Sequence, residues 1–392
     1  MTRFDVAVIG GGIHGVGVAQ AAAAAGHSVI VIEKDRLAAG TSSKSSKLIH
    51  GGLRYLESYE FRLVAECLRE RALLLRLAPE LVKLQPFHIP VYDTTRRSPL
   101  LIRAGLSLYA LLAGFSRGTT FGSLPRSRWD QLDGLRTEGL RAVFRYHDAQ
   151  TDDRLLTRAV MRSAQTLGAR LLTEARVEAI ELHAEGAELE IRHRGESTTC
   201  SARFVVNAAG PWVHEVLERI TPVQQALPLT LVQGSHLEFE PFCHQGMYYV
   251  ESPRDGRAVF VMPRKGHTLV GTTEVRYRGH PDDVHILPAE RNYLVSVVEH
   301  YFPQLGGTAR DRVRSGWAGL RVLPAGEGHA FHRSRETILE LDDPKAAKLL
   351  TIYGGKLTAY RATAERVVRS MRPFLPRRRQ RGDTTRLPLA PA

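Results

Sequence analysis

Apolar runs alternate with glycine-rich and charged stretches from the beginning of the chain. "FDVAVIG", residues 4–10, is a short β-branched run typical of a buried parallel strand. Small residues and alanines follow at helical density over residues 11–26, with Gly26 as the expected C-cap. "HSVIVIEK", residues 27–34, has the pattern of a second buried strand. Together these segments predict a β-α-β unit at the N-terminus.

The rest of the chain divides into helical and strand-rich stretches. Amphipathic helices are predicted at 59–78 and 152–167, and "ARFVVNAAGPWV", residues 202–213, is a buried strand that ends at small residues. Residues from about 220 to 345 are rich in short strands and turns, and "LLTIYGGKLTAYRATAERVV" returns to strand, glycine turn and helix. This order predicts an α/β nucleotide-binding domain built from separated segments, with an antiparallel sheet inserted between them.

Length and cysteine content narrow the class of protein. The 392 residues are enough for two domains, and Cys67, Cys200 and Cys243 lie too far apart for a disulfide scaffold or a zinc site. Asp5 inside the first apolar run argues against a signal peptide. The apolar segment 104–116 is shorter than the roughly 20 residues of a spanning helix. It is predicted to be a buried or cap helix, with a shallow membrane contact left open.

The net charge of +13 indicates an anionic partner. Part of it lies in "RPFLPRRRQRGDTTR" near the C-terminus, which is expected to be disordered and to be attracted to anionic lipid or nucleic acid. No RNA-recognition signature supports a specific nucleic-acid partner. A phosphorylated substrate would fit the same charge.

A glycine motif supplies the first specific chemistry. Gly10-x-Gly12-x-x-Gly15 lies between a predicted strand and a predicted helix, the context of the dinucleotide-binding fingerprint. Gly10 permits the tight turn, Gly12 lets the backbone approach a pyrophosphate, and Gly15 allows the helix to pack close to the strand. Glu33 ends the second strand, where a carboxylate would bind the ribose hydroxyls. The alternative, a glycine-rich turn without a ligand, is disfavoured because the strand, the helix and Glu33 all accompany the motif.

Two later segments favour FAD over NAD. "NAAGPW", residues 207–212, places small residues at the end of a buried strand, where backbone would lie close to a nucleotide. "YGGKLTAYR", residues 353–361, is a glycine turn that runs into a helix. A helix N-terminus directed at the flavin ring would stabilise the negative charge of the reduced ring. The sequence therefore predicts an FAD-binding protein.

Six motifs in order give a resemblance to a known family. "SSKLIHGGLRYLE", "NAAGPW", "GTTE", "GLRVLP", "SRETIL" and "GGKLTAYR" resemble the FAD-dependent glycerol-3-phosphate dehydrogenases over about residues 4 to 370. The resemblance implies a Rossmann-like, glutathione-reductase-like FAD-binding domain with an inserted antiparallel substrate domain. It implies oxidation of sn-glycerol 3-phosphate to dihydroxyacetone phosphate by hydride transfer from C2 to flavin N5. It also implies quinone, or oxygen, as electron acceptor and a cytoplasmic location, at most peripheral at the inner face of the membrane.

The domain assignment that follows has six parts. Residues 1–90, 151–215 and 346–372 are expected to form the FAD-binding domain, residues 91–150 a cap segment, residues 216–345 the substrate domain, and residues 373–392 a disordered basic tail.

The resemblance assigns site residues by position. Cofactor contacts are expected from Gly10, Gly12, Ile13, His14, Gly15, Glu33, Lys34, Thr41, Ser42, Ser45, Ser46, Leu48, Val177, Ala208, Gly210, Trp212, Gly354, Gly355, Lys356, Leu357 and Thr358. The expected catalytic residues are His50, Arg54, Tyr55, Arg321 and Arg335, and substrate contacts are expected from Arg54, Tyr55, Arg321, Arg335, Lys356 and Thr358. No metal site is predicted.

The residue types suit that chemistry. Planar guanidinium groups such as those of Arg54 and Arg335 bind a phosphate dianion well. A histidine that titrates near neutrality, His50, can take the proton of the C2 hydroxyl, although an arginine-rich site could share this role. Arg333 replaces Arg335 if the alignment shifts by two residues.

Other polar residues are expected to have structural roles. The arginines at positions 62, 69 and 71 are expected on a solvated helix face, and His236, His267 and His280 show no metal-ligand spacing.

Two departures from the family and two alternatives remain. Glu274 stands in "GTTE" where relatives commonly have aspartate, and the C-terminal helical domain of relatives has no counterpart here, which leaves dimerisation or other homo-oligomerisation open. The first alternative is an FAD-dependent oxidase of a 2-hydroxy acid or an amine. The second is a flavin-binding partner protein without catalysis.

Overall fold

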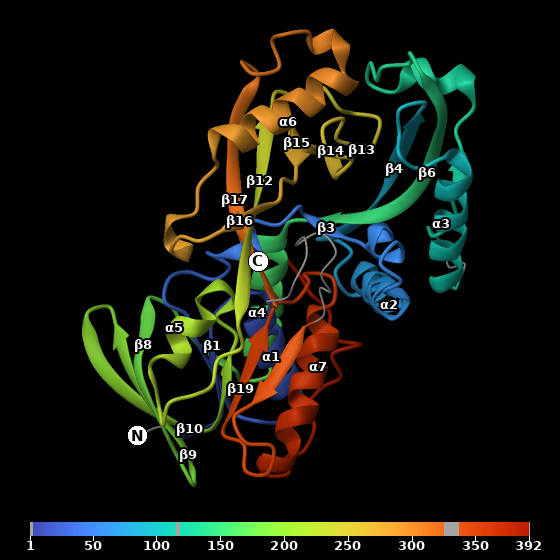
Figure 1. The fold of residues 1–392 in the computed structure, drawn as a ribbon. Helices are drawn as coiled ribbons and strands as arrows, with labels where there is room; N and C mark the ends of the chain where they lie inside the picture. The colour runs from blue at the N-terminus through green and yellow to red at the C-terminus, as the bar shows by residue number, and fades with distance from the viewer. Residues whose placement is uncertain (1–2, 115–117, 325–336, 392) are drawn as a thin grey trace.

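Two β-sheets organise the chain in a computed structural model that describes residues 3–114, 118–324 and 337–391 (Figure 1). The first sheet lies in the lower lobe of Figure 1 and the second in the upper lobe, and the long strand β12 runs between the lobes. This arrangement confirms the predicted fold class, an α/β nucleotide-binding domain with an inserted sheet.

The first sheet has a parallel centre. Strand β1 pairs in parallel with both β10 and β2, and β10 also pairs in parallel with β19. Val6 and Val8 of β1 pack on the helices of one face, whereas Ala7 and Ile9 pack on the other face, as the two-residue period of a strand requires. Its strands are β1 (Arg3–Ile9), β2 (Val29–Ile32), β7 (Arg170–Leu172), β8 (Ala175–His183), β9 (Gly186–His193), β10 (Glu196–Asn207), β11 (Ile220–Thr221), β18 (Ile338–Leu341) and β19 (Leu349–Tyr353).

The second sheet is antiparallel except where β13 pairs with β4. Helix α6 packs on one face, and α2 and α3 pack on the other. Its strands are β3 (Leu48–Ile49), β4 (Val82–Tyr92), β5 (Gly122–Ser123), β6 (Leu140–Thr151), β12 (Leu229–Phe239), β13 (Met247–Glu251), β14 (Ala258–Arg264), β15 (His267–Gly271), β16 (Val275–Tyr277) and β17 (Val313–Pro324).

Helices α1, α2, α4 and α7 lie where they were predicted, whereas α6 lies in the stretch that was predicted to contain only short strands and turns. Helices α1, α4 and α7 share one apolar core with the first sheet. Helix α3 begins earlier than the apolar segment 104–116 suggested, because Ser98 caps it through a hydrogen bond that its hydroxyl accepts from Leu101 N. The helices are α1 (Ile13–Ala24), α2 (Phe61–Leu77), α3 (Pro99–Leu112), α4 (Asp153–Thr166), α5 (Val213–Leu217), α6 (Pro288–Tyr301) and α7 (Tyr360–Met371).

Strand pairing differs from the expected segment boundaries at two places. Strand β4 belongs to the second sheet although most of it precedes residue 90, because it pairs along its whole length with β6. Strand β18 belongs to the first sheet although it precedes residue 345, because it pairs with β19. Long-range pairing of this kind leaves no mark in the local apolar pattern.

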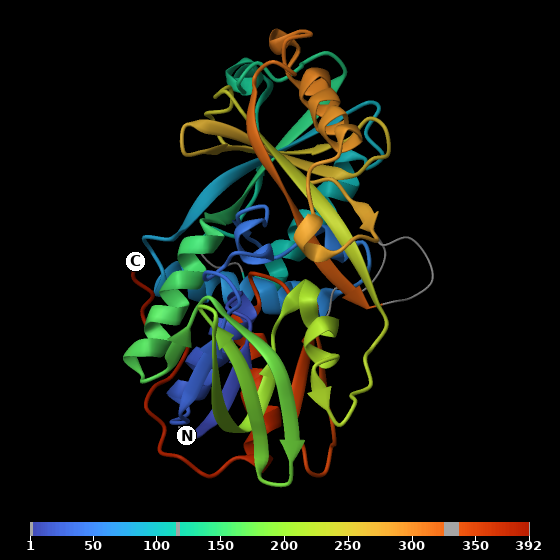
Figure 2. The ribbon, with the colours of Figure 1, turned by 90° about the vertical axis from the view of Figure 1, so that its left-hand side faces the viewer.

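The C-terminal segment was expected to be disordered, and that prediction is wrong for residues 373–391. The guanidinium group of Arg378 donates to the carboxylate of the buried Asp5, and Leu389 is itself buried, with its N–H donating to Leu77 O. Figure 2 shows this segment running past the N-terminal strand on the outside of the lower lobe. A basic composition predicted solvation, but pairing with a buried carboxylate holds the segment in place.

Candidate active site

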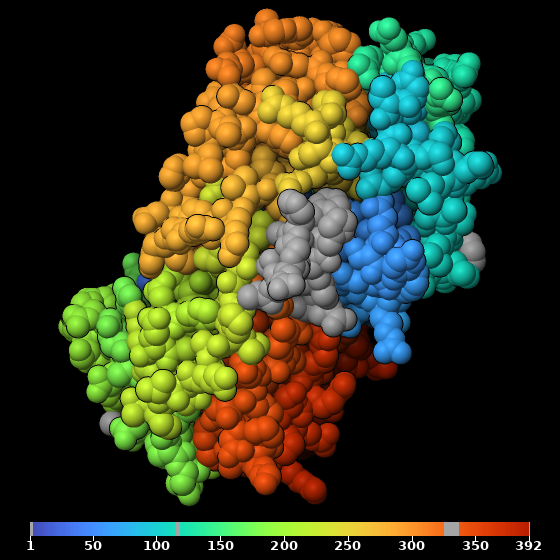
Figure 3. Space-filling view, viewed as in Figure 1, coloured from blue at the N-terminus to red at the C-terminus, as the bar shows by residue number. Residues whose placement is uncertain are grey.

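One cavity of about 860 Å³ lies where the two lobes meet. Figure 3 shows the orange segments of the upper lobe in contact with the yellow-green segments of the lower lobe. Both lobes supply its wall: the glycine loop after β1 and the 41–55 segment on one side, and strands β12 and β17 on the other. Among the residues predicted for the site, all that the structure describes line this cavity except Gly15. Arg335 and the alternative Arg333 lie outside the described residues.

Glycines shape the end of the cavity near helix α1. Gly10 has φ +108°, and a Cβ there would lie 2.6 Å from Ala208 O. A Cβ on Gly15 would lie 1.9 Å from Gly10 O, so Gly15 lets the helix pack on the loop and does not itself face the cavity. The N-cap Gly12 provides no side-chain hydrogen bond, and no acidic residue occupies the first turn. The helix therefore presents the positive end of its dipole to the cavity.

Glu33 lies at the end of β2 as predicted. Its carboxylate accepts hydrogen bonds from Gly11 N at 2.6 Å and from Asp35 N at 2.9 Å. Burial raises the pKa of Glu33 despite these bonds. Beside it, Lys34 Nζ lies 4.2 Å from the centre of the Trp212 ring and 3.0 Å from Asp282 Oδ1.

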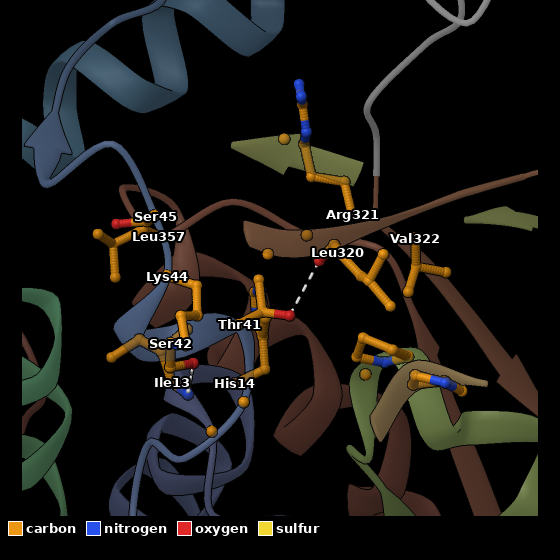
Figure 4. Close-up of a pocket in the computed structure, with 18 of the residues that line it drawn as sticks. Ile13, His14, Thr41, Ser42, Lys44, Ser45, Leu320, Arg321, Val322 and Leu357 are labelled. Carbon is orange, nitrogen blue, oxygen red and sulfur yellow. Dashed lines mark hydrogen bonds between the residues drawn. The ribbon is translucent and has the colours of Figure 1, made fainter. Parts of the chain in front are cut away.

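The polar segment 41–46 is held by contacts to both lobes. Thr41 donates to Leu320 O at 2.9 Å, which Figure 4 shows as a dashed line across the cavity wall. Ser42 Oγ accepts a hydrogen bond from Ile13 N at 2.8 Å, and this bond places the Ser42 side chain beside the first residue of helix α1. Ser45 donates to Asp153 Oδ2 at 2.7 Å. These serines therefore position the backbone of the loop as well as lining the cavity.

Asp153 anchors this loop to helix α4. It is fully buried at the start of α4, and it forms an ion pair with Lys47 at 2.6 Å. Burial lowers the pKa of Lys47, and the neighbouring Asp153 raises it again in part. Since two paired charges are buried together, the loop has little freedom to move away from α4.

The turn that carries the predicted catalytic histidine meets the last glycine turn. His50 N donates to Thr358 Oγ1 at 3.1 Å, although these residues are 308 positions apart. Lys356 Nζ lies 3.7 Å from the centre of the Tyr55 ring. Gly355 has φ +119°, and a Cβ there would lie 2.1 Å from the ring of His14. The structure thus brings the 50–55 and 354–358 segments together as the resemblance implied.

Arg321 reaches the cavity from strand β17. Figure 4 shows its side chain on the opposite side of the strand from Leu320 and Val322. Its guanidinium group donates to Thr273 O at 3.0 Å and lies 3.9 Å from Glu274. A Cβ on Gly234 would lie 2.6 Å from Thr272 Oγ1 and 2.7 Å from Nη2 of Arg321, so a side chain at this position would displace one of these groups.

A buried network under the His50 turn was not predicted. Tyr109 donates to Asp148 Oδ2 at 2.7 Å and accepts from Gly51 N at 2.8 Å. Arg71 pairs with the same Asp148, and all three side chains are buried. The expectation that Arg71 lies on a solvated face is therefore wrong, because its carboxylate partner comes from β6. The only local signal was the group of aspartates in "DAQTDD", residues 148–153, where β6 ends and α4 begins.

His236 was also missed. It lines the cavity, is 3% exposed, and its Nε2 lies 2.9 Å from Ser46 Oγ. Its scattered position in the sequence suggested no role, because Ser46 is 190 positions away.

The cavity fits an FAD molecule. The glycine loop and the helix start suit a pyrophosphate, the carboxylate of Glu33 suits a ribose, and the glycine turn at 354–355 leaves room for a flat ring beside Lys356. Over residues 3–114, 118–324 and 337–391, no group of three His, Cys, Asp or Glu residues could hold a metal ion.

Comparisons with known proteins agree with this fit. The family model "FAD dependent oxidoreductase" (DAO) matches residues 5–361. The chain is 37% identical to a D-erythritol 1-phosphate dehydrogenase of Brucella abortus and 39% identical to a glycerol-3-phosphate dehydrogenase of Pseudomonas tolaasii. Both matches cover 95% of this chain, with 74% and 72% of the respective relative. The glycerol-3-phosphate dehydrogenase of Bacillus halodurans, solved with FAD, has a TM-score of 0.76 at 28% identity, covering 99% of this chain and 68% of that one.

Proposed function

The chain belongs to the DAO family of FAD-dependent oxidoreductases and to its glycerol-3-phosphate dehydrogenase branch, and from this we propose that it oxidises sn-glycerol 3-phosphate to dihydroxyacetone phosphate. When bound in the cavity, FAD would supply the two-electron acceptor for the oxidation of C2. The remaining work, binding the phosphate, orienting C2 and moving the hydroxyl proton, belongs to side chains of this chain.

One observation carries the proposal. His50, Arg54, Tyr55, Arg321 and Lys356 come from three distant parts of the sequence and line the same cavity as the dinucleotide fingerprint. Three cationic side chains beside a histidine suit a substrate with a phosphate and a hydroxyl that must lose its proton. An amine substrate would need a different charge balance.

The cationic residues have separate tasks in this proposal. Arg54 and Arg321 bind the phosphate through charge-assisted hydrogen bonds, for which a planar guanidinium group is well shaped. His50 takes the C2 hydroxyl proton, because its backbone is fixed by Thr358 and its ring lies in the cavity wall. Lys356 stabilises the negative charge that develops on the substrate oxygen. Arg335, outside the described residues, remains a predicted third phosphate ligand.

Anaerobic mixing tests the substrate. The FAD-loaded protein is mixed with sn-glycerol 3-phosphate, lactate or glycine, and flavin absorbance is followed. Bleaching by the phosphorylated polyol alone supports the proposal. Bleaching by lactate or glycine supports the 2-hydroxy-acid or amine oxidase alternative, and no bleaching by any of them or by D-erythritol 1-phosphate supports a non-catalytic partner protein.

D-Erythritol 1-phosphate is the second candidate substrate. The relative from Brucella abortus with that activity is 37% identical over 376 residues, so similarity alone does not separate the two polyol phosphates. The same anaerobic experiment, with both compounds titrated, compares the flavin reduction rate and half-saturation for each. A higher ratio of rate to half-saturation with the four-carbon compound would replace glycerol 3-phosphate in the proposal.

We further propose that quinone is the electron acceptor and that the chain reaches it at an anionic membrane surface. The described residues contain no helix that is both long enough and apolar enough to span a membrane. Helix α3, at the edge of the upper lobe in Figure 1, exposes Leu100 by 79% and Leu101 and Leu111 by 58% each. Arg103 is exposed on the same helix. Exposed leucines beside arginine favour shallow binding to anionic lipid.

Vesicle binding tests this part separately. Leu100→Ser with Leu111→Ser should weaken co-sedimentation with vesicles that contain anionic phospholipid and should leave flavin reduction by substrate unchanged. Val223→Ser, at a residue that is 94% exposed on another part of the surface, is the matched control. Equal binding by all variants would exclude α3, and the basic C-terminal segment would become the remaining candidate.

A further inference from the structure

His236 and Ser46 form a polar pair that the proposed reaction does not use. Ser46 belongs to the 41–50 segment, whereas His236 lies in the middle of strand β12 in the second sheet. Both residues line the cavity, and Ser46 Oγ lies 2.9 Å from His236 Nε2. The pair therefore connects the wall built by the inserted sheet to the loop expected along the flavin.

The imidazole ring of His236 is held in one orientation. It stacks on Trp317, with ring centres 5.4 Å apart and planes 21° from parallel. On another side it is so close to Gly271 that a Cβ there would lie 2.2 Å from its Cδ2 atom. A ring packed in this way cannot turn to find another partner, so the contact to Ser46 is a fixed feature of the wall.

The ring is neutral, and its surroundings select one tautomer. Burial, followed by the charges of Lys47, Arg321 and Arg264, lowers the pKa of His236 to about 3. The Nδ1 atom is buried, and none of the described residues forms a hydrogen bond with it. An unpaired N–H in this cationic environment would be costlier than an unpaired lone pair. The proton therefore belongs on Nε2, which donates to Ser46 Oγ.

This direction of donation decides what the serine can do. An oxygen that accepts from Nε2 directs its own proton elsewhere, and no described residue accepts a hydrogen bond from Ser46 Oγ. The atom belongs to a residue of the cavity wall. We propose that His236 is a positioning residue that fixes the Ser46 hydroxyl as a hydrogen-bond donor to the bound flavin ring. The proposal rests on FAD binding in this cavity and does not depend on which substrate is oxidised.

A donor to the flavin ring has a consequence that can be measured without turnover. Reduction adds negative charge to the ring, so a hydrogen bond from Ser46 stabilises the reduced form more than the oxidised form. Ser46→Ala should therefore lower the midpoint potential of the bound FAD. A tenfold change in the reduction equilibrium corresponds to about 30 mV for a two-electron couple, and this is the expected size.

Dye-coupled reductive titration of the FAD-loaded variants tests the pair. Ser46→Ala and His236→Phe should shift the potential in the same direction, and the double variant should shift it no further than Ser46→Ala, because one change removes the donor and the other removes the contact that orients it. His236→Gln should restore most of the potential, since its amide can donate to Ser46. Ser43→Ala is the control, because the buried hydroxyl of Ser43 donates to Gly40 O and is not part of the cavity wall.

The outcomes separate the parts of the inference. An unchanged potential in Ser46→Ala would overturn it. If Ser46→Ala shifts the potential but His236→Phe does not, His236 has no positioning role. The same conclusion follows if His236→Gln shifts the potential as much as His236→Phe does. Since the titration contains no substrate, an error in the substrate assignment leaves its result unchanged. Failure of the unaltered protein to bind FAD would instead contradict the cofactor assignment.

Discussion

The two ends of the cavity are built in different ways. The end near helix α1 is built mainly around one stretch, residues 9–35, with residues 208–212 beside it, and its shape depends on backbone and on missing side chains at Gly10, Gly12 and Gly15. The end near His50 is assembled from β12, β17, the 41–55 segment and the 354–358 turn, and it depends on charged side chains. A dinucleotide is bound by a local motif, whereas the reacting end requires the whole tertiary structure.

Two buried aspartates, Asp148 and Asp153, hold the 41–55 segment at the end of the cavity near His50. Asp148 holds the turn at Gly51 through Tyr109, and Asp153 holds Ser45 and Lys47. Asp148 lies near the end of β6 and Asp153 is the first residue of α4, so the two aspartates are five positions apart in the chain. One rigid segment therefore fixes the loop at two points, so a change at either aspartate should affect the reacting end and leave the other end unchanged.

The largest expected effect breaks the motif-built end. In Gly15→Ala the new Cβ would lie 1.9 Å from Gly10 O, so the loop or the helix must shift and the pyrophosphate site is lost. We expect the purified variant to contain almost no FAD, measured as the ratio of absorbance at the flavin band to that of the protein. Gly105→Ala in α3 is the control, because a Cβ there meets nothing within 4 Å. Normal FAD content in Gly15→Ala would contradict the close packing of α1 on the loop.

Removing Asp153 tests the side-chain-built end. Asp153→Ala leaves the ammonium group of Lys47 buried without its partner, which should lower the free energy of unfolding by about 3–5 kcal/mol. The double variant Lys47→Met with Asp153→Ala should recover part of that loss, because no buried charge remains. Denaturant titration measures both. Glu178→Ala, in an exposed ion pair with Arg192, should cost at most about 1 kcal/mol.

Arg54→Ala should separate substrate binding from cofactor binding. The loss of charge-assisted hydrogen bonds, each about 1.5–3 kcal/mol, should raise KM for sn-glycerol 3-phosphate by about 10- to 100-fold. FAD content should not change, because Arg54 lies at the other end of the cavity from the glycine loop. Steady-state kinetics and flavin absorbance check this, with the exposed Arg62→Ala on α2 as control. If FAD is lost, Arg54 does not act as a phosphate ligand.

Two histidines of the cavity wall, His14 and His236, add a comparison through pH. Burial lowers the pKa of His14 to about 4 and that of His236 to about 3, whereas an unfolded histidine titrates near 6.5. Below pH 6.5 the unfolded chain therefore binds more protons than the folded chain. The free energy of unfolding should be independent of these two histidines above pH 6.5, and it should decrease as the pH falls from 6.5 toward their folded pKa values. Each histidine should contribute up to about 1.4 kcal/mol per pH unit in this window.

Variants of these histidines measure the two contributions separately. His14→Gln and His236→Gln should each make the unfolding free energy less steep between pH 6.5 and 4.5, as measured by denaturant titration. His183→Gln, at an exposed histidine, is the control. Identical slopes in all three variants would show that the two rings are not buried in the neutral form.

The smallest expected effect concerns the C-terminal segment. Arg378 is 44% exposed at its side chain, so solvent screens its pair with Asp5, and Arg378→Ala should lower the unfolding free energy by up to about 1 kcal/mol. Arg386→Ala, whose side chain is 85% exposed, should have no measurable effect. FAD content and activity should be normal in both. A loss of unfolding free energy well above about 1 kcal/mol in Arg378→Ala would contradict the solvent screening of this ion pair.

Much of this picture could be read from the sequence because its signals are local. The β-α-β unit, the glycine fingerprint, Glu33 and the glycine turn at 354–355 depend on residues close together in the chain, and apolar periodicity locates α2 and α4 within two residues. The order of six motifs indicated the family and hence the set of residues around the flavin.

Other features depend on partners that are far apart in the sequence. Nothing near Arg71 shows that Asp148 will lie beside it, and nothing near His236 points to Ser46. The same holds for β4, which joins the second sheet by pairing with the distant strands β6 and β13, and for the basic C-terminal segment, which is ordered by Asp5. The sequence by itself determined the nucleotide motif and the types of side chain available for the reaction. Only the tertiary structure decided which charges are buried and paired, because burial and pairing depend on contacts between segments that the folded chain brings together.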